Sequence, residues 1–498
     1  MCYRFVPQLT LLSAFSIAGF VVMGYHPGVE DDGVYLAAIK SDLAPALFPH
    51  DSAFVKLQLK TTLFDSLIAE SVQLSGVSLE WTLLVWQLLS LFLLVAGAWC
   101  MVAQLFEDFK ARLGALVMLT AMFTLPVAGT ALYIADQYLH PRTIASALIL
   151  FAISRVLAGR NWQTIPLLGS ACLLHPLMGA YGASFCCILA LQPQRIITVF
   201  DQRFQSSGQR SAALLCAPAM QLDWIFRRPL PIVKSILQSR HWYCLYDWTW
   251  YEWAGVVGPL VLSWMVYRLA HKSANTKLIR ISSAILVYGT VHQALAMVIL
   301  APELDLGLGA LEPMRYLHLI YLLMVVIGGA LLGKHILQNK IECWLLIALA
   351  VNGGMFYAQR QLFAESPHLE LPWIQSSNPW VQAFDWIKVN TPKDAYFALG
   401  PSYLEIPGEN FHGFRALAER SALCDEAKDA SVVTKVPDLA TEWRKEVEAQ
   451  RNWDSFDYRD FERLKETTGA TWVVLSKEPP PGLNCRWHRE NLHVCKIQ

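Results

Sequence analysis

Long apolar runs, separated by short polar loops, fill the first 360 residues of this 498-residue chain. An apolar stretch of about 20 residues is long enough to cross a bilayer as a helix. The runs predict membrane helices near 8–25, 79–104, 113–128, 143–158, 162–174, 176–191, 211–222, 252–270, 281–300, 315–333 and 341–358. They therefore indicate a polytopic α-helical membrane protein with about 11 transmembrane helices. The break between the fifth and sixth runs falls at His175-Pro176, because proline ends or kinks a helix.

Basic residues gather in alternate loops, and this bias predicts the orientation of the chain. With the N-terminus in the cytoplasm, each short cytoplasmic loop carries Lys or Arg, as at Lys110 and Arg112, or Lys334 and Lys340. An odd number of spans then places the C-terminus outside the cytoplasm. We therefore expect a multi-pass protein of the bacterial inner membrane, with a cytoplasmic N-terminus and an extracytoplasmic C-terminal domain.

The chain divides by composition into a transmembrane domain at 1–360, with a large first outer loop at 26–78, and a domain at 361–498. The second part resembles an ordinary soluble α/β domain, with helix patterns such as 380–389 and strand patterns such as 471–475. The formal net charge is zero and no basic tract occurs, so nothing indicates a nucleic-acid partner.

Two cysteines, Cys485 and Cys495, flank a predicted hairpin in this last domain. Outside the cytoplasm they are able to form a disulfide. Cys424 is a competing partner, and a pair of unbonded thiols is the other interpretation. No Cys/His spacing typical of a metal site occurs in the chain.

Three consecutive acids, Glu30, Asp31 and Asp32, follow directly on the first apolar run. Carboxylates this close repel one another, so at least one pKa rises unless a cation or a metal neutralises the group. A carboxylate poised in this way is able to act as a general base. The structural alternative is a solvated loop that caps the next helix.

Basic side chains also collect where the predicted spans reach the outer face. These basic residues are His140 and Arg142 in the second outer loop, His175 in an apolar run, Arg240 and His241 in an aromatic-rich loop, and Arg315 at the start of a span. Arginine binds phosphate in a bidentate manner. Snorkelling to lipid head groups, interfacial anchoring and interhelical hydrogen bonds are the structural alternatives. An anionic, lipid-linked substrate would explain why these residues gather on one membrane face.

These features together resemble the GT-C superfamily of membrane glycosyltransferases. The resemblance covers nearly the whole chain and rests on its architecture and on four local segments, namely Glu30-Asp31-Asp32, Tyr138-Leu139-His140-Pro141-Arg142, His175-Pro176 and Pro313-Met314-Arg315. The C-terminal part also looks like the tail domains of bacterial members, in a little-characterised group. No single motif is diagnostic.

The resemblance implies a polyprenyl-phosphate sugar donor, a glycan, lipid or protein acceptor, and surrounding membrane lipids as partners. It assigns the role of base to Asp31 or Asp32, of which we favour Asp31. Arg315 and Arg142 would hold the donor phosphate, and His175 and His241 would line the pocket. Family members differ in metal use, so a divalent metal is compatible with the resemblance and no cofactor is required by it.

Two other classes of function remain open from the sequence. A transporter or flippase of lipid-linked glycans would be expected to carry polar groups through the bilayer and repeated halves. The sequence shows neither feature. A non-catalytic partner in envelope glycan assembly would use the C-terminal domain as its binding surface.

Overall fold

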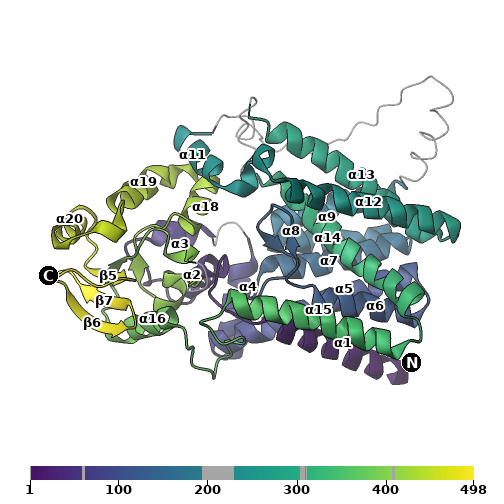
Figure 1. Ribbon diagram of the computed structural model, residues 1–498, viewed down its shortest axis with the longest axis horizontal. Coiled ribbons are helices and arrows are strands. Elements are labelled where there is room, and N and C mark those ends of the chain that lie inside the picture. The colour runs from purple at the N-terminus through teal and green to yellow at the C-terminus, as the bar shows by residue number, and fades with distance from the viewer. Residues whose placement is uncertain (1, 59–61, 193–228, 303–308, 310, 407–409) are drawn as a thin grey trace. The chain divides into compact units, whose positions relative to one another are not determined.

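The computed structural model describes residues 2–58, 62–192, 229–302, 309, 311–406 and 410–498. It divides into two compact units (Figure 1). The helical unit comprises Met1–Ser16, Leu91–Ala135 and Arg142–Val351. The mixed unit comprises Ile17–Ser90, Asp136–Pro141 and Asn352–Gln498. The first loop thus packs with the C-terminal domain, although the sequence separates them by some 300 residues of membrane-type helix.

The apolar runs of the described residues are helical. The helices are α1 (Cys2–Met23), α5 (Leu79–Leu105), α6 (Phe109–Ala121), α7 (Pro141–Leu157), α8 (Thr164–Leu174), α9 (Pro176–Ala190), α11 (Pro231–Ser239), α12 (Trp250–Lys272), α13 (Thr276–Ile299), α14 (Leu317–Leu332) and α15 (Ile341–Leu362). Within the described ranges, five segments are long and apolar enough to cross a membrane: Leu79–Leu105, Trp250–Lys272, Thr276–Ile299, Pro313–Leu337 and Ile341–Leu362. The prediction of a mostly helical chain that contains apolar helices of membrane-spanning length is confirmed. The span predicted at 211–222 lies outside the described residues.

Two helix boundaries show how local sequence shapes the helical unit. The predicted break at His175-Pro176 is present, and the His175 side chain caps α9 by accepting a hydrogen bond from the Met178 backbone N–H at 3.4 Å. Helix α6 ends at Ala121, short of the predicted 128, and Pro126 begins the short strand β1 (Pro126–Val127), which pairs with β2 (Leu132–Tyr133). Proline supplies no backbone donor for a longer helix.

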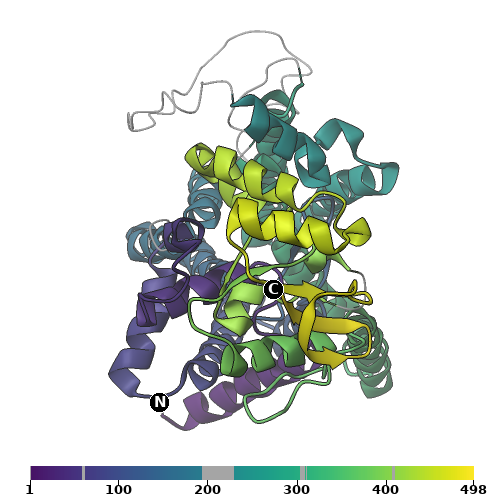
Figure 2. The same ribbon diagram turned by 90° about the vertical axis from the view of Figure 1, so that its left-hand side faces the viewer.

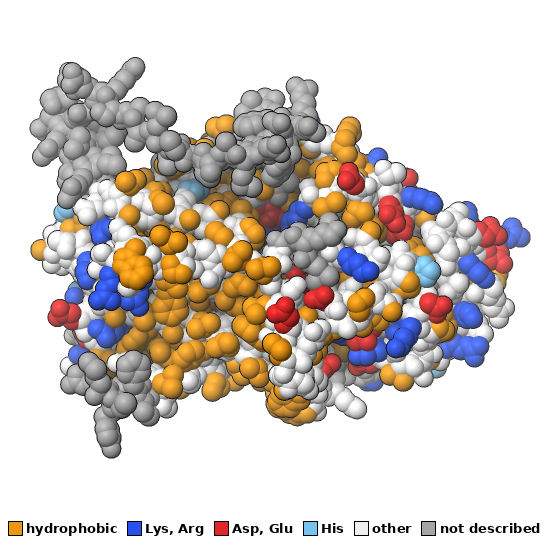
Figure 3. All heavy atoms as spheres, turned by 180° about the vertical axis from the view of Figure 1, so that it is seen from behind, with side chains coloured by type: hydrophobic (Ala, Val, Ile, Leu, Met, Phe, Trp, Pro, Cys, Tyr) orange, Lys and Arg blue, Asp and Glu red, His pale blue; other side chains and the backbone are white. Residues whose placement is uncertain are grey.

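Helices α6 and α14 pack closely through glycine. A side chain at Gly329 would collide with the Gly114 carbonyl oxygen and with Met118, and one at Gly333 would collide with the Lys110 carbonyl oxygen. Small residues let helix backbones approach closely, which is how helices associate in lipid. Figure 3 shows the apolar side chains that cover much of one face over the long helices, whereas Lys, Arg, Asp and Glu are interspersed over the C-terminal domain.

The first loop folds into three short helices of the mixed unit, α2 (Asp32–Leu43), α3 (Ser52–Gln58) and α4 (Phe64–Ser75). The C-terminal domain adds α16 (Pro379–Asn390), α17 (Phe414–Ala418), α18 (Lys428–Lys435), α19 (Ala440–Ala449) and α20 (Tyr458–Thr468). Its strands are β3 (Tyr396–Ala398), β4 (Ser421–Ala422), β5 (Trp472–Leu475), β6 (Asn484–Arg489) and β7 (Leu492–Lys496), in the spatial order β4-β3-β5-β7-β6.

Alternate residues of this sheet face two separate cores. Phe397 and Val474 pack with Phe384 of α16, whereas Val473 on the opposite face packs with Phe461 of α20. Because strand side chains alternate between faces, one sheet can hold helices on both sides. Figure 2 shows α16 and α20 on opposite sides of the strands. The small α/β domain predicted at the C-terminus is confirmed.

The outer hairpin of the sheet is cross-linked. Cys485 and Cys495 lie directly opposite each other on β6 and β7 and form a disulfide. Cys424, the competing partner considered from the sequence, is a buried free thiol.

Candidate functional site

The first loop is held against the C-terminal domain by backbone hydrogen bonds. The Glu30 N–H donates to the Phe411 carbonyl at 2.8 Å, and the Gly413 N–H donates to the Gly28 carbonyl at 2.8 Å. A Cβ at Gly413 would come within 2.7 Å of the Gly33 Cα, so this approach requires glycine. The acids that follow the first apolar helix therefore have a fixed position within the mixed unit.

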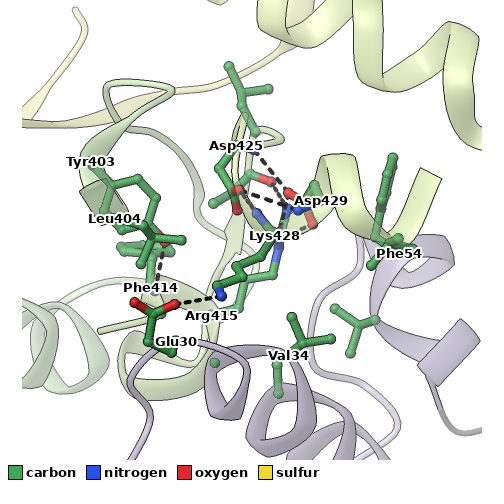
Figure 4. A pocket seen from close by; sticks show the side chains of 17 residues that line it. Glu30, Val34, Phe54, Tyr403, Leu404, Phe414, Arg415, Asp425, Lys428 and Asp429 are labelled. Carbon is green, nitrogen blue, oxygen red and sulfur yellow. Dashed lines mark hydrogen bonds and ion pairs between the residues drawn. The ribbon is translucent and has the colours of Figure 1, made fainter. Parts of the chain in front are cut away.

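A lysine of the C-terminal domain lies between two of these acids. Figure 4 shows its contact with one of them, Glu30. Lys428 Nζ donates to Glu30 Oε2 at 2.6 Å and to Asp31 Oδ1 at 2.9 Å. The side chains of Glu30 and Asp31 are 45% and 40% exposed, and that of Lys428 is 19% exposed. Burial alone would lower the pKa of Lys428, but Asp31 and Glu30 outweigh it and raise this pKa above its usual value. The cation that the acidic run requires is thus an ammonium group of this chain.

The other oxygen of Asp31 faces a histidine. Asp31 Oδ2 lies 4.0 Å from His140 Nε2, and His140 Nδ1 lies 3.9 Å from Asp136 Oδ2. The Tyr35 ring packs edge-on against the imidazole, with 5.1 Å between the ring centroids. His140 and Asp136 are almost fully buried, whereas Asp31 is half-exposed. Asp31 is therefore the member of this group that an incoming molecule is able to reach.

Asp32 differs from its two neighbours because it is buried. Its Oδ2 accepts a hydrogen bond from the Gly28 N–H at 2.6 Å. Burial raises the pKa of Asp32 to about 7, although the Gly28 hydrogen bond and Lys40 oppose this rise. A buried carboxyl that closes its own loop is suited to shaping the loop, so the structure distinguishes Asp32 from the exposed pair Glu30 and Asp31.

A hollow opens beside the ion pairs. Its lining residues come from the first loop and the C-terminal domain, namely Glu30, Gly33, Val34, Ala37, Phe54, Val55, Tyr403, Leu404, Gly413, Phe414, Arg415, Ala422, Leu423, Asp425, Lys428, Asp429 and Val432. Arg415 fixes one side, because its guanidinium pairs with Asp51 and donates to both oxygens of Asp429 at 2.9 Å. The walls are mostly apolar, and Glu30 and Lys428 supply charge (Figure 4).

In the helical unit, Arg142 and Arg315 approach one histidine. Both guanidinium groups lie close enough to the His318 imidazole to act on it electrostatically. His318 Nε2 lies 3.0 Å from the Ile134 carbonyl oxygen. Arg315 pairs with Glu312, whose Oε1 accepts a hydrogen bond from the Tyr243 hydroxyl at 2.9 Å. Arg142 and Arg315 are thus two predicted site residues of the helical unit that act on the same histidine.

The remaining predicted residues have local structural partners. His241 Nε2 lies 2.7 Å from Glu252 Oε1, and Arg240 stacks over the Trp242 ring at 5.5 Å. The first contact joins the aromatic segment before α12 to the first turn of that helix, and the second lies within the segment. His175 is the N-cap of α9. The contacts of these three side chains account for their positions without a ligand.

A bound metal ion would need several donor side chains that converge on one point. Among the residues that the structure describes, no group of three or more His, Cys, Asp or Glu side chains is placed to hold a metal ion. At the acidic run, Lys428 already binds both Glu30 and Asp31. The donor set present there fits an ammonium group better than a divalent cation.

The sequence alone does not reveal two polar contacts of the mixed unit, that of Lys428 with the acidic run and that of Glu370 with two histidines. Lys428 lies 397 residues from Asp31, and no local pattern marks it. Glu370 lies between two histidines, with its Oε1 2.9 Å from His26 Nδ1 and 3.2 Å from His412 Nε2. Pairings at such separations leave no periodicity or motif, so only the fold reveals them.

The chain matches no known family and no curated protein sequence. The resemblance to membrane glycosyltransferases therefore rests on the architecture and on the local segments described above.

Proposed function

We propose that this protein is a membrane glycosyltransferase that moves a sugar from a polyprenyl-phosphate donor to an acceptor on the extracytoplasmic face. The observation that supports this proposal most is the half-exposed carboxylate of Asp31, which lies between His140 and Lys428, a residue that lines a hollow. An acceptor hydroxyl needs a base as its oxygen attacks the anomeric carbon. A carboxylate with one oxygen anchored and its side chain accessible is suited to that role.

The reaction balances with the residues at hand. The acceptor oxygen bonds to the anomeric carbon, the bond from that carbon to the phosphate oxygen breaks, and polyprenyl phosphate leaves. Asp31 takes the acceptor proton. Arg142 and Arg315 would bind the phosphate and stabilise the charge that develops on it, which is where preorganised cations contribute most. Their common approach to His318 supports this assignment.

The proposal includes a location and an architecture. We propose a GT-C-like arrangement with about 11 spans in the bacterial inner membrane. The N-terminus would be cytoplasmic and the C-terminal domain extracytoplasmic. The disulfide between Cys485 and Cys495 supports this side of the membrane, because disulfides persist in oxidising compartments.

Reconstitution tests the proposal. The purified chain in liposomes would be given polyprenyl phosphates that carry radiolabelled hexoses or pentoses, together with an envelope lipid extract as acceptor source. The wild type should release polyprenyl phosphate and pass label to the acceptor fraction. Asp31→Asn should lose this activity. Asp42→Asn on α2 should retain it, because Asp42 neither pairs with Lys428 nor lines the hollow.

Two results would replace this proposal with another class of function. Transport of intact labelled lipid across the bilayer, with no donor consumed, would identify a transporter or flippase. A protein that neither consumes nor moves any donor, yet captures an envelope assembly partner equally well after Asp31→Asn, would be a non-catalytic component.

A further inference from the structure

We propose that Lys428 is a positioning residue for Asp31, so that the C-terminal domain supplies an essential part of the catalytic site. This inference deepens the proposed function and rests on it. Lys428 would hold one oxygen of Asp31 so that the carboxylate stays ionised and keeps a fixed orientation. It would also offer an N–H to an oxygen of the acceptor in the adjoining hollow.

The position of Lys428 is itself fixed by a network at the start of α18. Asp425 Oδ1 accepts hydrogen bonds from the backbone N–H groups of Ala427 at 2.8 Å and Lys428 at 2.5 Å. Asp429, one residue further on, binds Arg415, which in turn pairs with Asp51 of the first loop. The backbone at Lys428 is thus held by hydrogen bonds to Asp425 and, through Asp429 and Arg415, by an ion pair with the first loop. The Lys428 side chain therefore starts from a fixed backbone position, as a residue that positions a catalytic group requires.

The ammonium group has capacity for a ligand. It carries three N–H donors. Among the described residues, Glu30 and Asp31 accept two of them. Because the Lys428 side chain also lines the hollow, the third donor is available to a hydroxyl or anionic oxygen bound there. The acceptor group that this site would select is therefore a hydroxyl, which would lie next to the carboxylate that removes its proton.

The orientation of Asp31 depends on the same contact. Oδ1 points to Lys428, and Oδ2 is left on the side of His140. Without the ammonium group, Asp31 and Glu30 would lose the cation that bridges their two carboxylates. Asp31 would then protonate more readily, because an adjacent positive charge favours the ionised form.

A purely structural role for Lys428 is the competing explanation. However, other contacts already join the first loop to the C-terminal domain, namely the backbone pairing at Glu30 and Gly413 and the ion pair of Arg415 with Asp51. Ion pairs with half-exposed carboxylates add little to stability. Removal of the Lys428 side chain should therefore alter the chemistry of Asp31 more than the stability of the fold.

Three variants test this inference: Lys428→Met, Lys428→Arg and the control Lys388→Met. Lys388 also pairs with a carboxylate, Glu419, at 2.7 Å, and is not among the residues that line the hollow. The first readout is the pH dependence of donor consumption. The second is the pH dependence of carbodiimide labelling of Asp31, followed by mass spectrometry, because the reagent modifies protonated carboxyl groups.

We expect Lys428→Met to lower kcat/KM by about 100-fold, as for a misplaced catalytic group. The acidic limb of its pH profile and its labelling midpoint should both move up by about one pH unit, because the ammonium favours the ionised carboxylate. Lys428→Arg should retain the wild-type midpoint, and Lys388→Met should behave as wild type. Unchanged labelling and pH profile in Lys428→Met would overturn the inference, whatever the change in thermal stability.

The labelling readout separates this inference from the proposed function. If the wild type consumes no donor, the proposed function fails. A shifted labelling midpoint in Lys428→Met would still support control of Asp31 by Lys428, and an unshifted midpoint would refute it.

Discussion

Lys428 Nζ donates a hydrogen bond to Asp31 Oδ1 at 2.9 Å, although 397 residues separate them in the chain. Asp31 follows the first apolar helix, and Lys428 begins a helix of the C-terminal domain. The chain itself thereby supplies a cation to a loop that carries three adjacent carboxyl groups. The same contact leaves Asp31 accessible, which explains why we assign the catalytic role to Asp31 among the three acids.

Asp32→Asn should separate the structural acid from the catalytic one. The pKa of Asp32 is about 7 in the folded protein, above the model-peptide value of 3.8. The unfolded chain therefore loses this proton first, and the folded state loses stability as the pH rises from about 4 to 7, by up to about 1.4 kcal/mol per pH unit. Asn keeps an oxygen that accepts from Gly28 and does not titrate.

We therefore expect the difference in unfolding temperature, Asp32→Asn minus wild type, to increase from pH 5 to pH 7. Asp42→Asn serves as the control and should show no such trend. This difference in unfolding temperature is measured by thermal unfolding of the detergent-purified proteins at each pH. A difference that stays constant with pH would show that Asp32 does not hold its proton in the folded state.

The cluster of His26, Glu370 and His412 should make the mixed unit sensitive to acid. His26 is fully buried, and its ring stacks on Phe363 at 3.9 Å. Burial lowers the pKa of His26. Burial of Glu370 opposes ionisation, but His412 and His26 lower its pKa to about 2. Both shifts mean that the unfolded chain binds more protons, so stability falls as the pH drops below about 6.5 for His26 and below about 4.3 for Glu370.

Glu370→Gln should remove much of the stabilising effect of this cluster. At pH 7 we expect a loss of about 1–3 kcal/mol, because buried donors lose a charged acceptor. Glu365→Gln is the matched control, since Glu365 lies on the same segment and is exposed. Denaturant unfolding of the two variants is the measurement. Equal stabilities for the two would argue against the cluster as a stabilising contact.

Two adjacent glycines in α14 offer a test of the helical unit. A Cβ at Gly329 would meet the Gly114 carbonyl oxygen at 2.6 Å, whereas a Cβ at Gly328 would meet no atom within 4 Å. Gly329→Ala should therefore destabilise the protein by about 1–3 kcal/mol through overpacking. Gly328→Ala should be neutral or slightly stabilising, because alanine favours the helix. Thermal unfolding in detergent compares them, and similar behaviour of the two would contradict the close packing of α6 on α14.

The disulfide should stabilise the C-terminal domain. Cys485 and Cys495 close a short loop with a sequence separation of 10, for which chain entropy predicts about 2–3 kcal/mol. A reductant should lower the unfolding temperature of the wild type and leave that of the double variant Cys485→Ser, Cys495→Ser unchanged. A wild type that is insensitive to reductant, with both thiols labelled by maleimide after unfolding, would show that the bond contributes nothing.

The sequence predicted those parts of the fold that depend on local pattern. Apolar length located the helices, and Pro176 located the break between α8 and α9. A run of residues that favour strands located β5. The predicted helix lengths were less accurate where a turn interrupts an apolar run, as after Ala121, where α6 ends. About 11 spans stays a prediction, because length and composition support five in the described ranges.

The candidate site was predictable only in part. Asp31 and His140 stood out as polar residues beside apolar runs, and the structure brings them within 4.0 Å of each other. Lys428, Glu370 and His412 had no such signal, because each lies in an ordinary soluble sequence. Their roles arise from tertiary contacts with the first loop. That Arg142 and Arg315 act on the same substrate as Asp31 stays a prediction.

The most direct test of the central claim is the single-turnover rate of sugar transfer from a polyprenyl-phosphate donor by Asp31→Asn protein, measured against wild type. Both proteins would first be shown to have the same unfolding temperature. Loss of a general base should slow transfer by at least about 100-fold. A rate within about twofold of wild type, well below the smallest effect expected of a general base, would contradict the assignment of Asp31 as the base.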